Sequence, residues 1–123
     1  MPGDVVYVAG EMGAGKTAFV RGACAALGVT AAVTSPTYTV GHLYRSPQSL
    51  VAHLDLYRFS GMTTEEWIDL EPYFDQTIAF VEWPEAGEGV LPKPRIRVTM
   101  RITGDNARLI VVDSDDAVLI ASL

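Results

Sequence analysis

Hydrophobic positions fall into short runs along the 123-residue chain, separated by polar segments that contain glycine or proline. The first run, VVYVAG at 5–10, is rich in β-branched residues and predicts a buried strand. The segment KTAFVRGACAAL at 16–27 consists mostly of helix-forming residues and precedes Gly28, a typical residue after a helix. Because it is apolar almost all round, we expect a helix packed on more than one side.

The rest of the chain predicts more strands than helices. TYTVGHLY at 37–44 and SLVAHLDLY at 49–57 flank the turn-like RSPQ and predict a hairpin. TTEEWIDLEPYF at 63–74 opens with Thr63 and Glu66 in a capping-box spacing, which predicts a helix that Pro72 limits. Further strands are predicted for TIAFVEW at 77–83 and RIRVTMRI at 95–102. ARLIVVD at 107–113 and AVLIASL at 117–123 supply one or two more, around a turn at Asp113–Asp116.

Two predicted helices are too few to cover both faces of a purely parallel sheet. We therefore predict an α/β fold with a mixed sheet and few helices. The length suits one domain, residues 1–123.

Composition narrows the functional class. No window approaches the roughly 18 consecutive apolar residues of a membrane span, and no signal peptide is recognisable. The single cysteine, Cys24, excludes an intramolecular disulfide, so we expect a cytoplasmic protein. A formal net charge of −6 argues against a surface that binds nucleic acid broadly, because neutralising phosphates requires clustered basic residues.

The segment GEMGAGKT, between the first predicted strand and the first predicted helix, matches the P-loop pattern G-x-x-x-x-G-K-[ST]. Its glycines allow backbone N–H groups to surround phosphate oxygens. We expect the lysine to reach the β- and γ-phosphates and the threonine hydroxyl to coordinate Mg²⁺. The predicted nucleotide-binding residues here are Gly10, Glu11, Met12, Gly13, Ala14, Gly15, Lys16 and Thr17.

Hydrolysis needs an acidic group near Mg²⁺ and a group that positions water. Asp55 and Glu82 each end an apolar run, so both are predicted at the carboxyl ends of strands, where open α/β sheets bind ligands. One would help to hold Mg²⁺, directly or through water, and the other would orient the attacking water. The hydroxyl-rich TSPTYT at 34–39 is a candidate switch loop in which Ser35 and Thr37 sense the γ-phosphate.

Other residues leave alternatives open. Trp83 either lines the nucleotide pocket, faces a partner or belongs to the core. Arg58 is more consistent with a solvent-facing ion pair than with catalysis. His42 and His53 have no further ligand at a useful spacing, so we expect no metal site there. The acidic residues of the second predicted helix form either a solvated face or a docking patch for a basic partner: Glu65, Glu66, Asp69 and Glu71.

Taken together, GEMGAGKT, SPTYTV, HLDLYR and VEWPE resemble, in order and spacing, the bacterial TsaE family. These are small P-loop ATPases of tRNA threonylcarbamoyladenosine biosynthesis. The segment GEGVLPKPRIRV also resembles the residues that follow VEWPE in proteobacterial members. The resemblance covers nearly the whole chain, and its four motifs are far more specific than the P-loop alone.

The resemblance implies roles for individual residues. Lys16 would be the phosphate lysine and Thr17 the Mg²⁺ ligand. Asp55 would contact the nucleotide or its metal shell. Glu82 would be a second Mg²⁺ ligand or the residue that organises hydrolysis.

Thr37 would belong to the switch-like loop, and Arg108 matches a basic position near the C-terminus that reaches the nucleotide. Family members do not transfer the threonylcarbamoyl group themselves. They bind a threonylcarbamoyl-transferase complex, and their hydrolysis of ATP to ADP supports its repeated turnover, so tRNA is contacted only through that complex.

The chain departs from the family pattern in two respects. Members usually carry a strand and a helix ahead of the P-loop, on the order of 25–30 residues, and we expect this N-terminal segment to be missing from the sequence. Many members also have a hydroxyl residue where this chain has Ala18, one position beyond the Mg²⁺ ligand. We expect that second difference to have little effect.

Two other functions compete with a Mg²⁺-dependent ATPase. A nucleotide-gated binding module would use ATP only to order the 34–39 segment and a partner surface. A small-molecule kinase is less consistent with the chain, because the arginines are scattered and there is no room for a lid. A GTPase is disfavoured because the sequence contains neither N-K-x-D nor D-x-x-G.

Overall fold

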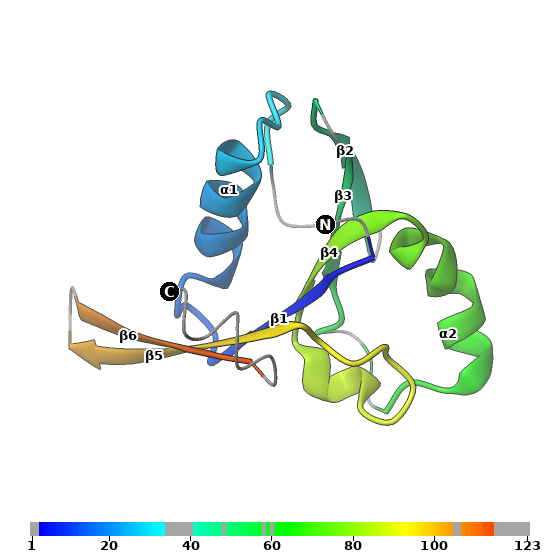
Figure 1. Ribbon diagram of the computed structural model, residues 1–123. Helices are drawn as coiled ribbons and strands as arrows, with labels where there is room; N and C mark the ends of the chain where they lie inside the picture. The colour runs from blue at the N-terminus through cyan, green and yellow to red at the C-terminus, as the bar shows by residue number, and fades with distance from the viewer. Residues whose placement is uncertain are drawn as a thin grey trace.

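The computed structural model describes residues 3–33, 41–47, 49–57, 59, 61–104 and 107–114. The strands within these residues form one sheet (Figure 1), in the order β2-β3-β4-β1-β5-β6. Their bounds are β1 (Val5–Gly10), β2 (Gly41–Arg45), β3 (Leu50–Asp55), β4 (Thr77–Glu82), β5 (Ile96–Gly104) and β6 (Ala107–Asp113).

The sheet is mixed, as the sequence predicts. Strands β3, β4, β1 and β5 run parallel to one another, whereas the edge strands β2 and β6 pair antiparallel with β3 and β5. The carboxyl ends of the four parallel strands therefore meet at one end of the sheet. Open α/β sheets bind their ligands at that end.

Each face of the sheet has its own helix (Figure 1). Helix α1 (Lys16–Ala26) packs on one face, where its buried Val20 and Cys24 join a core that includes Val8, Val51 and Phe80. The other face carries α2 (Thr64–Leu70) and the short 3₁₀ helices η1 (Glu71–Phe74) and η2 (Pro84–Gly87). The core there combines strand residues with buried residues of these segments: Leu54, Val81, Met62 and Leu70.

Local sequence signals account for the element boundaries. Thr63 caps α2, accepting a hydrogen bond from the Glu66 N–H at 3.2 Å, while its own N–H donates to the Glu66 carboxylate at 2.9 Å. This confirms the predicted capping box. Pro72 does not simply end the helix: the chain continues as 3₁₀ helix η1, in which Pro72 occupies an early position that needs no N–H donor.

Several predicted elements differ in extent from the structure: the strand predicted over 49–57 is Leu50–Asp55, and the one predicted over 95–102 is Ile96–Gly104. The first helix ends at Ala26, with Leu27 as its C-cap, and the strand predicted over 77–83 ends at Glu82 because Trp83 is left-handed. Residues 37–40 of the predicted hairpin and the predicted strand over 117–123 lie outside the described residues. None of the helices among the described residues is long and apolar enough to cross a membrane.

Candidate functional site

The P-loop connects the carboxyl end of β1 to the first turn of α1. A Cβ atom on Gly10 would lie 2.6 Å from the Met100 carbonyl oxygen of β5, so only glycine fits there. Gly15, the residue before α1, has a φ of 99°, which glycine adopts without strain. Within the described part of the chain, no side chain caps α1. Its first N–H groups are therefore suited to an anion.

Lys16 folds back across this loop. Its side chain is nearly buried, and Nζ donates to the Gly10 and Glu11 carbonyl oxygens at 2.7 and 2.8 Å. The same nitrogen lies 4.2 Å from the centre of the Trp83 ring, a cation–π distance. Burial lowers the pKa of Lys16 below its ordinary value. Four nearby carboxylates act in the opposite direction and raise this pKa, those of Glu82, Asp55, Glu85 and Glu11. A partly desolvated ammonium thus lies among acidic groups.

Trp83 holds an unusual backbone conformation directly after β4. Its φ is 57°, in the left-handed region, which costs a non-glycine residue about 1–2 kcal/mol. Its carbonyl oxygen accepts the Ala86 N–H at 3.2 Å, and its ring packs 5.1 Å from the Tyr57 ring. Of the three alternatives for Trp83, this arrangement favours the first, a residue that lines a cavity beside the P-loop.

Asp55 and Glu82 lie at the carboxyl ends of β3 and β4, as predicted, and they are register partners. Glu82 is only 2% exposed. The Thr17 hydroxyl of α1 donates to its two carboxylate oxygens, at 3.0 Å to Oε2 and 3.2 Å to Oε1. The more exposed Asp55 accepts the Tyr57 N–H at 3.0 Å. The fold thus brings together the threonine and both carboxylates predicted from the sequence.

These groups surround one cavity of about 300 Å³, which we call the P-loop cavity. Its lining consists of Met12, Gly13, Gly15, Lys16, Thr17, Ala18, Asp55, Glu82 and Trp83. The described residues contain no cluster of three His, Cys, Asp or Glu side chains that could bind a metal by themselves. A hydroxyl beside one or two carboxylates instead suits Mg²⁺, which commonly completes its shell with phosphate oxygens and water.

His53 is a site residue that the sequence analysis missed. It is fully buried on β3, and its Nε2 lies 2.5 Å from Glu82 Oε2. The available signal was the two-residue spacing from His53 to Asp55, which puts both side chains on the same face of a strand. No local pattern indicates that a carboxylate from another strand meets the ring.

A second cavity, of about 480 Å³, adjoins the P-loop cavity and shares Gly15 and Ala18 with it. The rest of its lining is mostly apolar, namely Ala14, Phe19, Met100, Arg108 and Ile110. Arg108 lies on β6 and its Nη2 donates to the Gly13 carbonyl oxygen at 3.4 Å. Glu11 accepts the Ile102 N–H at 3.2 Å and so ties the loop to β5.

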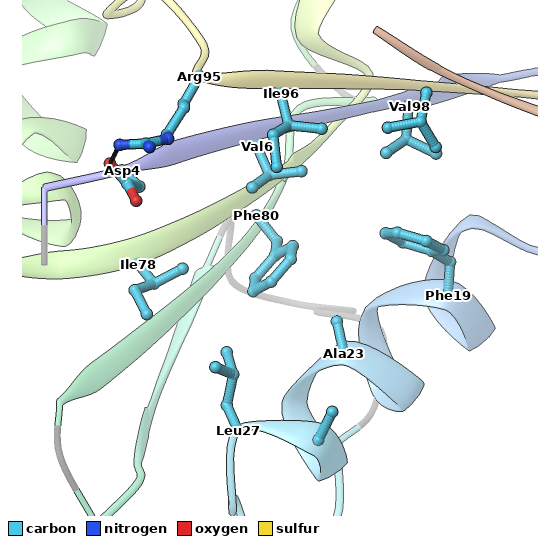
Figure 2. Close-up of a pocket in the computed structure, with 12 residues that line it drawn as sticks. Asp4, Val6, Phe19, Ala23, Leu27, Ile78, Phe80, Arg95, Ile96 and Val98 are labelled. Atoms are coloured by element: carbon cyan, nitrogen blue, oxygen red, sulfur yellow. Dashed lines mark ion pairs between the residues drawn. The ribbon is translucent and has the colours of Figure 1, made fainter. Parts of the chain in front are cut away.

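A third cavity, of about 490 Å³, lies between α1 and the sheet (Figure 2) and contains none of the predicted site residues. We call it the apolar cavity. Phe19, Ala23 and Leu27 of α1 face strand side chains across it, and Asp4 pairs with Arg95 at its edge, 3.5 Å apart. Three residues weighed in the sequence analysis, Ser35, Thr37 and Arg58, lie outside the described residues.

A protein-family model described as "Threonylcarbamoyl adenosine biosynthesis protein TsaE" matches residues 1–110. The chain belongs to the TsaE family. Membership confirms the resemblance drawn from the four motifs. The match includes the P-loop, both strand-end carboxylates and the basic position at Arg108.

Several relatives and a solved structure are similar to this TsaE-family chain. TsaE of Bacillus subtilis is 36% identical over 107 residues, which make up 87% of this chain and 67% of the relative. TsaE of Haemophilus influenzae is 37% identical over 97 residues, which make up 78% of this chain and 61% of the relative. The crystal structure of YdiB from Bacillus subtilis superimposes with a TM-score of 0.75 at 33% identity, covering 94% of this chain and 70% of YdiB.

Proposed function

We propose that this protein is a Mg²⁺-dependent ATPase of tRNA threonylcarbamoyladenosine biosynthesis, which hydrolyses ATP in support of a partner threonylcarbamoyl-transferase complex. Its membership of the TsaE family and the names of its relatives support this pathway. One structural observation carries the ATPase proposal: Lys16, Thr17, Asp55 and Glu82 line a single cavity beside the N-terminus of α1. A phosphate-binding loop, a hydroxyl and two carboxylates are the parts that phosphoryl transfer to water requires.

The P-loop would hold the β- and γ-phosphates of ATP. Backbone N–H groups of the loop and of the first turn of α1 would donate to the phosphate oxygens. Lys16 Nζ, held by two loop carbonyl oxygens, would exchange part of those bonds for phosphate oxygens. The negative charge of the bound phosphates would favour the charged ammonium and so raise the pKa of Lys16, which burial lowers.

Thr17 and Glu82 fit Mg²⁺ by their chemistry, since both present oxygen atoms. The Thr17 hydroxyl proton points to Glu82, so an oxygen lone pair stays available for the cation. Glu82 would bind the cation directly or through one of its water molecules. Bound Mg²⁺ would neutralise charge that develops on the phosphates. Asp55, at the more exposed edge of the cavity, would orient the attacking water.

The nucleoside would occupy the second cavity. The two cavities share Gly15 and Ala18, so a ligand with phosphates in the first continues into the second past the first turn of α1. Phe19, Met100 and Ile110 offer apolar contacts to a base there. Arg108 would lie near the sugar and phosphates, consistent with the role implied by the family resemblance.

Turnover by the isolated protein should be slow. Lys16 is the only cationic side chain among the described residues that line the P-loop cavity, so no arginine is placed there to stabilise the transition state. Such an arginine can contribute about 10³-fold or more to the rate. The partner complex would supply the missing contribution. The same observation keeps a second candidate open, a nucleotide-gated binding module that hardly hydrolyses ATP.

The deciding experiment measures ATP hydrolysis with Mg²⁺, by the protein alone and with the transferase complex. Glu82→Ala is the test variant, and Glu88→Ala, at an exposed position six residues further along, is the matched control. We expect turnover that rises with the complex, is lost in Glu82→Ala and is unchanged in Glu88→Ala. Tight ATP binding without turnover in either mixture would contradict the ATPase proposal and favour the binding module.

A further inference from the structure

Two side chains hold the Glu82 carboxylate. The Thr17 hydroxyl donates to Oε2 at 3.0 Å and to Oε1 at 3.2 Å, and His53 Nε2 approaches the same Oε2 to 2.5 Å. The three side chains come from α1, β4 and β3 and form one connected chain of hydrogen bonds. The candidate function uses Thr17 and Glu82 but assigns nothing to His53.

The geometry fixes which atom of this contact carries the proton. A carboxylate only accepts hydrogen bonds, so His53 Nε2 must be the donor. With the proton on Nδ1 instead, two lone pairs would face each other at 2.5 Å. His53 Nδ1 has no hydrogen-bond partner among the described residues. The Nε2–H tautomer leaves a lone pair, not an N–H group, on this unpaired nitrogen.

The Nε2–H donor of His53 matters because few other groups fix the orientation of the Glu82 carboxylate. The carboxylate is 2% exposed, so water contributes little to its orientation. The Thr17 contact is expected to rearrange when the hydroxyl oxygen takes part in cation binding. The His53 ring, in contrast, is not among the residues that line the P-loop cavity, so cation binding there leaves its contact with Glu82 in place. The imidazole is therefore the fixed support of the carboxylate.

His42 shows that the contact is specific rather than a general property of histidines in this sheet. It lies directly opposite His53 in the β2–β3 register, and antiparallel partners share a face of the sheet. His42 is only half-buried, and its Nδ1 lies 3.0 Å from the Tyr44 hydroxyl. A histidine one strand away thus makes a different contact.

We propose that His53 is a positioning residue: its Nε2–H holds the Glu82 carboxylate in the orientation in which Glu82 and Thr17 receive Mg²⁺ and the nucleotide phosphates. The proposal rests on the function proposed above. It assigns His53 no contact with substrate. Residues that orient a metal-site group in this way typically change metal affinity or activity about 10- to 100-fold when removed.

The first test compares His53→Leu, His53→Gln and the matched control His42→Leu. The readouts are kcat with the transferase complex and the affinity for ADP with and without Mg²⁺. We expect His53→Leu to lose about 10- to 100-fold in kcat and most of the gain in ADP affinity that Mg²⁺ provides, while its Mg²⁺-free ADP affinity stays at the wild-type level. His53→Gln keeps an N–H donor near Glu82 and should recover most of both losses. His42→Leu should behave as wild type.

The second test needs neither ATP nor Mg²⁺. The chain has two histidines, so NMR of the imidazole nitrogens separates His53 from His42 without crowding. We expect His53 to be the Nε2–H tautomer, with a ring proton protected from exchange that loses its protection in Glu82→Ala. A His53 proton on Nδ1, or a signal that Glu82→Ala leaves unchanged, would overturn the proposal.

The two proposals fail in distinguishable ways. If the wild-type protein shows no turnover, the ATPase proposal is wrong. The role of His53 is then still decided by two measurements, its NMR signal and the effect of Mg²⁺ on ADP affinity. If wild type turns over and His53→Leu retains its kcat and its Mg²⁺ effect, His53 does not position Glu82. If His53→Leu does not fold, His53→Gln decides. Loss of the Mg²⁺ effect on ADP affinity in His53→Gln overturns the proposal. Retention of that effect, together with a protected Nε2–H of His53 in the wild-type protein, supports it.

Discussion

Helix α1 borders both the P-loop cavity and the apolar cavity, which differ in size and in the chemistry of their linings. The P-loop cavity, about 300 Å³, adjoins its first turn and is lined by polar groups, among them Lys16 and the hydrogen-bonded pair Thr17 and Glu82. The apolar cavity, about 490 Å³, adjoins its later turns and is lined mainly by hydrocarbon (Figure 2). The larger space is thus not the candidate site. Converging polar groups identify a site better than volume does.

The direction of the strands explains the difference. The P-loop cavity lies at the carboxyl ends of the parallel strands, next to Gly10, Asp55 and Glu82. The apolar cavity lies toward their amino ends, where Ile78 and Ile96 occur near the starts of β4 and β5. Helix α1 contributes N–H groups at one end and alanine and leucine side chains at the other. One helix therefore borders a polar cavity at its first turn and an apolar cavity at its later turns.

The largest expected effect follows from removing the cation of the P-loop cavity. Lys16→Ala should lower the affinity for ADP about 10- to 100-fold, because hydrogen bonds to a charged group contribute about 1.5–3 kcal/mol. The loss should be larger for ATP, whose γ-phosphate brings further negative charge near Glu82 and Asp55. Titration calorimetry measures both affinities.

Lys93→Ala is the matched control, since Lys93 is the other lysine of the chain and lines neither cavity. Its nucleotide affinities should equal those of wild type. Wild-type affinity in Lys16→Ala would mean that the phosphates bind elsewhere, and the contrast between the two cavities would lose its functional meaning.

A smaller effect, on stability alone, is expected from filling the apolar cavity. Ala23 is partly buried and points into it from α1 (Figure 2). Leucine propagates a helix nearly as well as alanine. Ala23→Leu should therefore raise the free energy of unfolding by about 0.5–2 kcal/mol through added apolar burial, with ADP affinity unchanged. Chemical denaturation measures the first quantity.

Ala25→Leu provides the comparison, because Ala25 is exposed on the same helix and lines neither cavity. It should change stability by no more than a few tenths of a kcal/mol. A loss of stability in Ala23→Leu would show that the space cannot accept a larger side chain. A change in ADP affinity would show that the two cavities are coupled through α1.

Features encoded within a few residues could be predicted from the sequence. The capping box at Thr63 and Glu66, the apolar strands and the glycines of the P-loop all depend on local chemistry. The positions of Asp55 and Glu82 at strand ends followed from the same reasoning. Even the mixed sheet could be inferred, because two helices are too few to cover a parallel one.

Contacts that depend on strand order and register could not be predicted. His53 meets Glu82 because β3 and β4 are neighbours, and nothing in either segment states that they pair. Trp83 precedes a proline, which favours extended backbone, yet it adopts a left-handed conformation and places its ring against Lys16. Tertiary contacts override the local preference there, which is typical of functional sites.

The smallest expected effect concerns the later turns of α1, where Cys24 is fully buried in the core against the sheet. Burial raises the pKa of the Cys24 thiol above its ordinary value of 9.0, because the charged thiolate is disfavoured in the core. Below pH 9.0 the thiol is neutral in both the folded and the unfolded chain, and its contribution to stability is fully present. Above pH 9.0 the unfolded chain loses the proton first, so the free energy of unfolding should fall as pH rises toward the folded-state pKa.

Cys24→Ala isolates this effect, because alanine lacks the titrating group and every other ionisable residue is retained. The difference in unfolding free energy between wild type and Cys24→Ala should be constant below pH 9.0. Above pH 9.0 the unfolding free energy of wild type should fall relative to that of Cys24→Ala. Denaturant unfolding over this range measures the difference. A thiol reagent supplies a second measurement: if α1 stays packed on the sheet, Cys24 should react only as fast as the helix detaches. A difference that does not change with pH, together with rapid labelling, would mean that α1 is loosely held at these turns, beside the apolar cavity.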